Sequence, residues 1–228
     1  NMNPDAKVVL WNYEDVENEF PEYMEHINNI PAWISKCDMA RFLILQKYGG
    51  IYSDLDFIPL RPIDSTVWDR DIFLINEPRF HVKKNEKGRL FNGFVGSKPA
   101  HPFIEGWVKN IIDHIEDQSI VWNVMDTTGP RSFYKYYTEN PIVDLDPEDA
   151  CRFIPVVRPV ENNLKGEYFV NPDCNSVEPF CYTTWVDGTN WGMGEYLRII
   201  KKLAPYILLV LVILFVLYKR YRKNRGRR

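Results

Sequence analysis

The sequence predicts one α/β domain with a mainly parallel sheet, followed by one membrane-spanning segment and a basic tail. Its 228 residues are 45% hydrophobic and 14% aromatic, enough for one domain with a sizeable core and an appendage. Short apolar runs alternate with helix-type stretches, an order typical of parallel α/β sheets. We expect the domain over residues 1–200, the membrane span over 203–218 and the tail over 219–228.

The first expected elements surround one strong helical signal. Val8–Trp11 predicts a short strand, and the acidic stretch Tyr13–Asn28 predicts helix. Cys37–Tyr48 contains Leu, Ile, Gln, Arg and Lys and no helix breaker, so it carries the clearest helical signal of the chain. Gly49-Gly50 follows directly, and glycine is the residue that most often ends a helix.

The elements after this helix rest on shorter signals. Ile51–Ile58 predicts a strand that Pro59 and Pro62 end. Residues 140–194 are rich in Pro, Asn and Gly, with short apolar runs such as Phe153–Val157. The remaining expected elements are strands at Asp71–Ile75 and Phe91–Gly96 and helices at Pro102–Ile115 and Phe133–Tyr137.

Charge is distributed unevenly along the chain. Seven cations and no acid follow Tyr218, and removing them from the net charge of −3 leaves −10 for the body. An acidic body argues against a nucleic-acid surface, which needs clustered Lys and Arg. The uncharged stretch Leu203–Tyr218 would cover roughly 24 Å as a helix, against about 30 Å for the core of a bilayer.

A short transmembrane helix explains the C-terminal pattern better than the alternative, a buried core helix, because a core helix rarely ends in seven cations. Lys and Arg at both ends can reach the membrane interface. The positive-inside rule then predicts a single-pass protein of a Golgi- or ER-type membrane, with its domain in the lumen. Cys174 and Cys181 are close enough in sequence to form a disulfide there, or they are buried thiols.

Two carboxylates interrupt the apolar run Ile51–Ile58. On a single strand, Asp54 and Asp56 point the same way while Leu55 faces the core. Such a pair suits a hard cation, Mn²⁺ or Mg²⁺, which can bridge to a diphosphate and neutralise the charge that grows as it leaves. Carboxylates without a ligand would be costly in so apolar a strand. The Asp-x-Asp spacing alone is uninformative, since it recurs at residues 69–71 and 144–146 without this context.

A second polar pair stands on the predicted helix. Asp38 and Arg41 are spaced i, i+3, as in a salt bridge on a helix surface, and Ser35-x-x-Asp38 has the form of a capping box. The helix after Arg41 is apolar enough to be buried, which favours a pair that faces a cleft instead. The residues alone leave both interpretations open.

These motifs together resemble the DXD sugar-binding region of the glycosyltransferase 32 family. That family includes yeast-type α-mannosyltransferases and mannosyl inositol-phosphoceramide synthases, and it is related to the large clostridial glucosylating toxins. The similarity covers roughly residues 3–195. It is carried by Asp38-x-x-Arg41, by Leu45-x-x-Tyr48-Gly-Gly-Ile-Tyr52-x-Asp-x-Asp56, by residues 92–103 and by Thr128-Gly-Pro130.

The resemblance implies a GT-A fold, a Rossmann-like domain with a mixed sheet. It also implies retaining transfer of a mannose- or glucose-like hexose from a nucleotide sugar, GDP-mannose or a UDP-hexose. The acceptor would be lipid-linked or a glycan of a glycoprotein, and Mn²⁺ or Mg²⁺ the cofactor.

The resemblance also assigns roles to single residues. Asp54 and Asp56 would be the catalytic and metal-binding pair, with Asn190 or Asp187 as a further oxygen ligand. The donor sugar would be held by Asp38, Arg41 and Asn92, and the nucleotide by Trp11, Tyr52 and Trp191. From the residues alone, Trp11 is equally well explained as a core aromatic, and an Asn beside a Gly, as Asn92 is, is more often a turn residue.

Two departures from the family keep other functions open. The usual first strand, of the type Ile-Pro-Lys-x-Ile-His-Gln, has no counterpart, and the His expected before the C-terminal Trp is missing from Trp185-Val-Asp-Gly-Thr-Asn190-Trp191. Both favour a non-catalytic sugar-nucleotide-binding protein on a membrane as the alternative. A haloacid-dehalogenase-type phosphatase also carries Asp-x-Asp on an apolar strand, but its Gly-Asp-x-x-x-Asp motif is not found.

Overall fold

The computed structural model describes residues 3–55, 57–59, 62–77, 87–117 and 124–142, with short pieces at 156–157, 169–170, 181–183, 203–206 and 218. The chain divides into two compact units, Asn1–Asp187 and Gly188–Arg228. Every polar contact discussed below lies within the first unit.

The N-terminal segment enters three short helical pieces. These are α1 (Tyr13–Glu19), the 3₁₀ turn η1 (Pro21–Tyr23) and α2 (Met24–Asn29), so the helix predicted at Tyr13–Asn28 is confirmed, although it is broken. The break falls at Pro21, which has no N–H to continue the ladder of α1. The strand predicted at Val8–Trp11 is wrong: none of the described strands pairs with this segment.

The central helix α3 (Trp33–Tyr48) confirms the strongest helical prediction. It ends at Gly49, which has φ +65° and whose N–H donates to the carbonyl of Leu45 at 2.8 Å. The helix begins four residues before the predicted start at Cys37. Its N-cap is therefore Ala32 and Ser35 lies inside the helix, so the predicted capping box is wrong.

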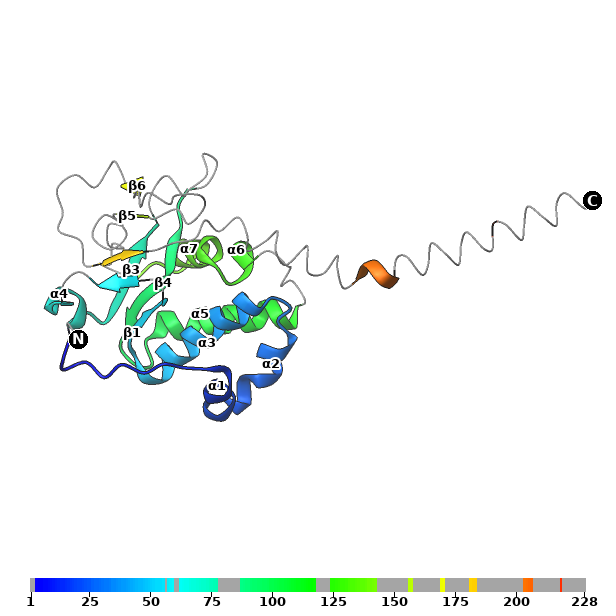
Figure 1. The fold of residues 1–228 in the computed structure, drawn as a ribbon, viewed down its shortest axis with the longest axis horizontal. Coiled ribbons are helices and arrows are strands. Elements are labelled where there is room, and N and C mark those ends of the chain that lie inside the picture. Colours follow the sequence, from blue (N-terminus) through cyan, green and yellow to red (C-terminus); the bar gives the residue numbers. More distant parts are fainter. Residues whose placement is uncertain are drawn as a thin grey trace, which may run out of the picture. The chain divides into compact units, whose positions relative to one another are not determined.

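Two small sheets follow this helix (Figure 1). The first has the order β1 (Gly50–Ser53), β4 (Leu90–Ser97), β3 (Ile72–Asn76), and the second has the order β2 (Phe57–Pro59), β7 (Cys181–Thr183), β5 (Val156–Val157), β6 (Phe169–Val170). The mixed α/β class is confirmed, but the mainly parallel sheet is wrong, because only the β5–β7 pairing is parallel among the five described. No described helix separates β3 from β4, so these strands pair antiparallel as neighbours in the chain.

The strand predicted at Ile51–Ile58 is divided between the two sheets. Asp54 follows the end of β1, Leu55 stands in a turn, and β2 starts at Phe57. Leu55 is 87% exposed and does not face the core. The prediction that the two aspartates project from one continuous strand is therefore wrong.

Helices cover one face of the first sheet. In Figure 1, α3 and α5 (Pro102–Glu116) run side by side there, and α7 (Pro130–Glu139) packs on β4. Phe42, Trp107 and Phe133 join the three helices, with ring centroids 5.0–6.0 Å apart. The other face packs on α4 (Ser65–Trp68), and the short α6 (Val124–Thr127) precedes α7.

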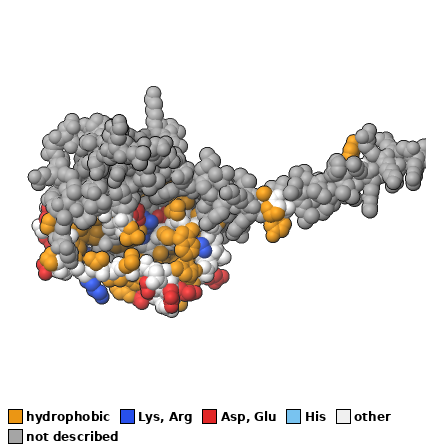
Figure 2. Space-filling view, in the orientation of Figure 1, with side chains coloured by type: hydrophobic (Ala, Val, Ile, Leu, Met, Phe, Trp, Pro, Cys, Tyr) orange, Lys and Arg blue, Asp and Glu red, His pale blue; other side chains and the backbone are white. Residues whose placement is uncertain are grey.

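The remaining sequence predictions agree with these elements. The strands expected at Asp71–Ile75 and Phe91–Gly96 and the helices expected at Pro102–Ile115 and Phe133–Tyr137 are confirmed, with ends that differ by up to three residues. Figure 2 shows hydrophobic side chains beside acidic ones on the surface of the described part. Tyr13 and Trp33 are both exposed, with ring centroids 5.4 Å apart.

In the second unit the structure describes helical residues at 203–206 and 218. None of the helices described has the length and apolar character needed to cross a bilayer. The predicted span 203–218 and tail 219–228 lie mainly outside the described residues, as does Cys174 of the predicted disulfide.

Candidate functional site

A charged pair is buried on α3. Asp38 and Arg41 are 2% and 6% exposed, and Arg41 Nη2 lies 3.1 Å from Asp38 Oδ1. The i, i+3 salt bridge predicted from the sequence is thus present, but it is enclosed rather than on the helix surface. Burying two charges is costly unless hydrogen bonds satisfy their remaining atoms.

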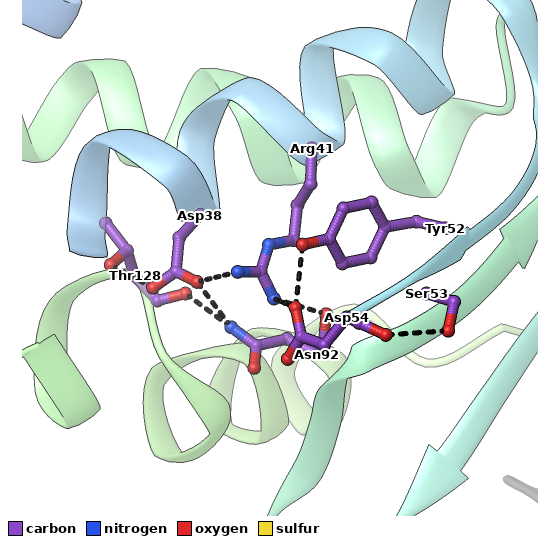
Figure 3. Close-up of polar contacts among 7 residues, drawn as sticks. All are labelled: Asp38, Arg41, Tyr52, Ser53, Asp54, Asn92 and Thr128. Atoms are coloured by element: carbon purple, nitrogen blue, oxygen red, sulfur yellow. Dashed lines mark hydrogen bonds and ion pairs between the residues drawn. The ribbon is translucent and has the colours of Figure 1, made fainter. Parts of the chain in front are cut away.

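Both oxygens of Asp38 are satisfied by partners distant in sequence (Figure 3). Oδ1 also accepts from Asn92 Nδ2 at 3.0 Å, and Oδ2 accepts from the Thr128 hydroxyl at 2.7 Å. Burial raises the pKa of Asp38 to about 6, although Arg41, Thr128 and Asn92 favour the charged form and oppose that rise.

Arg41 connects this carboxylate to a second one. Its Nη1 donates to the backbone carbonyl of Asn92 at 2.7 Å and lies 3.5 Å from Asp54 Oδ1. The guanidinium carbon stands 4.5 Å from the centre of the Tyr52 ring. Burial alone would lower the pKa of Arg41, but the charges of Asp38 and Asp54 outweigh it and raise the pKa, so Arg41 stays a cation.

Asp54 is the member of this group that reaches the surface. It follows β1, its backbone N–H donates to the carbonyl of Gly93 at 2.7 Å, and its side chain is 28% exposed. The Tyr52 hydroxyl donates to Oδ1 at 2.7 Å, and burial raises the pKa of Tyr52, so that this donor keeps its proton. A Cβ on Gly93 would overlap Asp54 Oδ2, so the glycine leaves room for the carboxylate.

We call Asp38, Arg41, Asn92, Thr128, Tyr52 and Asp54 the Asp38–Asp54 network. Its residues lie on α3, on β1 or directly after it, on β4, and in the turn between α6 and α7. Because these elements pack together, the geometry of the network is fixed by packing. Its three charges sum to −1, and Asp54 carries the exposed part of that charge. Such an arrangement can bind a polar ligand rich in hydroxyl groups at the Asp54 edge, with the buried atoms behind it already oriented.

The structure brings together five of the predicted site residues: Asp38, Arg41, Tyr52, Asp54 and Asn92. Trp11 lies elsewhere, where its ring packs on Phe20 and Tyr48 at 6.1 and 5.7 Å, which favours its interpretation as a packing aromatic. The other predicted residues, Asp56, Asp187, Asn190 and Trp191, lie outside the described residues.

Sequence reasoning missed the roles of Thr128 and Gly93. Both belong to stretches whose similarity to the family is only general. No local signal distinguishes them, because each acts on a residue distant in sequence: Thr128 lies 90 positions from Asp38. A threonine before Gly-Pro indicates a turn and nothing more.

The described residues do not form a metal site by themselves. Within the ranges described, no three His, Cys, Asp or Glu side chains gather as ligands. Asp54 Oδ1 is already engaged by the Tyr52 hydroxyl and by the Arg41 cation, which repels a second cation at the same oxygen.

Comparison with known proteins gives one family and several relatives. Residues 1–73 match the family described as "Glycosyltransferase sugar-binding region containing DXD motif". A mannosyl phosphorylinositol ceramide synthase of Saccharomyces cerevisiae is 31% identical over 57% of this chain and 33% of its own. The inositol phosphoceramide mannosyltransferase 3 of Schizosaccharomyces pombe is 29% identical over 57% of this chain and 35% of its own.

A glycosyltransferase of Acanthamoeba polyphaga mimivirus is 27% identical over 82% of this chain and 68% of its own. Among solved structures, the PaToxG glycosyltransferase aligns with 18% identity and a TM-score of 0.40, over 57% of this chain and 44% of that one. The chain spans about a third of the length of the two yeast relatives. The predicted resemblance to DXD glycosyltransferases is confirmed, and the relatives support an enzyme of the hexosyltransferase class.

Proposed function

We propose that this relative of the DXD glycosyltransferases carries the donor-binding part of an enzyme that moves a hexose from a nucleotide sugar to a membrane-associated acceptor. The Asp38–Asp54 network is the observation that carries the proposal. It combines two carboxylates, a guanidinium and an amide in fixed positions, with Asp54 open to solvent. Hydroxyl groups of a sugar are recognised by carboxylate and amide groups held in this way.

In this function Asp38, Arg41 and Asn92 hold the donor sugar in place, and Asp54 accepts hydrogen bonds from its hydroxyl groups or from the ribose. Asp56 is proposed as the main ligand of Mn²⁺ or Mg²⁺, a cofactor that would neutralise the leaving diphosphate. Asp54, Asn190 and Asp187 remain further candidate ligands, and Trp191 remains a candidate contact of the nucleotide. The fold we propose for the complete enzyme is GT-A.

The names of the relatives support a mannose donor and a lipid acceptor, since both yeast proteins are named for adding mannose to inositol phosphoceramide. GDP-mannose is accordingly the first donor to test, and a UDP-hexose the second. An acceptor of this kind is embedded in a membrane, which agrees with the predicted span at 203–218 and with a lumenal domain of a Golgi- or ER-type membrane. Retention of the anomeric configuration is part of the same proposal.

A non-catalytic sugar-nucleotide-binding protein is the second candidate. The pairing of Asp54 with Arg41 and Tyr52 favours it, because both partners compete with a cation for this carboxylate. Both candidate functions require binding of the nucleotide sugar, but only the transferase would turn it over.

The test uses the full chain purified in detergent, with GDP-mannose and UDP-glucose in separate reactions. Release of nucleotide is measured with Mn²⁺ and with a chelator, and donor binding is measured by calorimetry. We expect metal-dependent release that Asp56→Asn abolishes and Asp69→Asn, a control in another Asp-x-Asp, leaves intact. Binding without release would select the second candidate, and neither binding nor release would refute both.

A further inference from the structure

We propose that Thr128 is a positioning residue for donor binding: its hydroxyl fixes the orientation of the Asp38 carboxylate. The inference rests on the proposed function, because it names a residue that prepares the same site without touching the ligand. Thr128 is 0% exposed and its hydroxyl is bonded to Asp38, so it is assigned the positioning of that carboxylate and not a contact with the donor.

The first step is the geometry at Asp38. One oxygen faces Arg41 Nη2 and Asn92 Nδ2 at 3.1 and 3.0 Å, and the other faces the Thr128 hydroxyl at 2.7 Å. Rotation of the carboxylate about its last bond would break contacts on both sides. The Thr128 hydroxyl is the hydrogen-bond partner that the described residues give to Oδ2, so its loss leaves the orientation of the carboxylate to the contacts of Oδ1 alone.

The second step is that Thr128 is itself firmly held. Its N–H donates to the carbonyl of Val124 at 3.1 Å, and Pro130 starts α7 two residues later. Gly129 between them has no room for a side chain, because a Cβ would lie 2.8 Å from the carbonyl oxygen of Val124. The turn that carries the hydroxyl is therefore tightly packed.

The third step links this turn to the helix that carries Asp38. Phe133 of α7 packs on Phe42 of α3 with ring centroids 5.0 Å apart, one turn of α3 beyond Asp38. The two elements thus hold the hydroxyl and the carboxylate at a fixed separation. Thr128 also contacts Asn92, another residue proposed to hold the sugar: the Thr128 carbonyl oxygen lies 3.5 Å from Asn92 Nδ2.

The test compares Thr128→Val, which keeps the shape and removes the hydroxyl, with Thr128→Ser, which keeps the hydroxyl. Thr127→Val is the matched control, since the neighbouring Thr127 is also buried and its hydroxyl faces the carbonyl of Val124 at 3.4 Å. Donor affinity by calorimetry and kcat and KM for GDP-mannose are measured on the full chain, with Tm as the check on folding.

We expect Thr128→Val to lower kcat/KM and donor affinity by roughly 10- to 100-fold, the scale of a misplaced site group, and Thr128→Ser to recover most of the loss. Thr127→Val should stay within about threefold of the parent. Because the Thr128 hydroxyl lowers the pKa of Asp38, Thr128→Val should also move the acid limb of the pH profile upward. In the part of the chain that the structure describes, the other titratable groups facing Asp38 are Arg41, Asp54, Tyr52 and Cys37, and all three variants retain them.

Equal donor affinity and kcat/KM in Thr128→Val and the parent would overturn the positioning role and leave the proposed function intact. The same holds if Thr127→Val loses as much as Thr128→Val, or if Thr128→Ser fails to recover. A parent chain that neither binds nor turns over the donor would instead refute the proposed function, and the positioning role with it.

Discussion

Substituting Gly93 by Ala tests the site through shape alone, without removing any polar group. Gly93 lies on β4, and its carbonyl accepts from the N–H of Asp54 at 2.7 Å. A Cβ added at this position would lie 2.7 Å from the Phe91 ring and would overlap Asp54 Oδ2. Both neighbours must move for the methyl group to fit.

The size of the movement follows from these contacts. Ordinary contacts begin at 3.4 Å, so the Phe91 ring must retreat by about 0.7 Å and the Asp54 carboxylate by more. That shift is enough to break the 2.7 Å bond from the Tyr52 hydroxyl and to separate Asp54 from Arg41, now at 3.5 Å. We expect an overpacking cost of about 1–3 kcal/mol in unfolding free energy and a loss of roughly 100-fold in kcat/KM.

Gly96→Ala is the matched control on the same strand. Its Cβ would lie 3.2 Å from the Cβ of Phe73, a tight contact that small shifts relieve, and it does not approach Asp54. Nucleotide release from GDP-mannose and urea unfolding are measured for both variants. If Gly93→Ala keeps parental kcat/KM, the position of the Asp54 carboxylate does not matter for the reaction, and the reasoning fails. Equal losses in both variants would point to general damage to β4.

Three further outcomes follow from single contacts. Burial raises the pKa of Asp38 from 3.8 to about 6, so this carboxyl binds its proton more tightly in the folded chain than in the unfolded one. The unfolding free energy should therefore fall by up to about 3 kcal/mol as the pH rises from 4 to 6. Urea unfolding at several pH values should show a weaker fall for Asp38→Asn. Gly49→Ala should lower the unfolding free energy by about 1–3 kcal/mol, measured by urea unfolding, because φ is +65° and the new Cβ would lie 2.6 Å from Pro99 Cδ. Tyr52→Phe removes the hydroxyl that donates to Asp54 and should reduce kcat/KM about tenfold, a cost of about 1.4 kcal/mol that steady-state kinetics would detect.

Local signals predicted the elements that carry the site. The stretch without helix breakers before Gly49 predicted α3, and the i, i+3 spacing of Asp38 and Arg41 predicted their salt bridge. These properties depend on residues within one or two turns of each other. The partners Asn92 and Thr128 lie 54 and 90 positions from Asp38, and no periodicity or spacing carries information over that distance. Only the family resemblance indicated Asn92.

Two errors have a shared physical cause. The apolar run Ile51–Ile58 predicts one strand, and the alternation of strands and helices predicts a mainly parallel sheet; the described residues form neither. Both inferences use composition, whereas the choice of partner strand is made by tertiary packing. β1 pairs with β4 and β2 with β7, so the chain changes sheets at Asp54 and Leu55. Asp54 stands at this change of sheet: its backbone N–H donates to the carbonyl of Gly93, and its partly exposed carboxylate accepts from the Tyr52 hydroxyl.

The arrangement of charge also bears on how a donor and a cation could share the site. Arg41 is held between two carboxylates and a carbonyl, and its charge compensates half of what Asp38 and Asp54 carry. A divalent cation at the same oxygen of Asp54 would have to displace Arg41 from it, because like charges repel at this separation. Hydroxyl groups of a neutral sugar can bind beside Arg41 without that displacement. We therefore expect Asp54 to accept hydrogen bonds from the sugar or the ribose, and Asp56 to bind the cation. The two aspartates of the motif would then have different ligands.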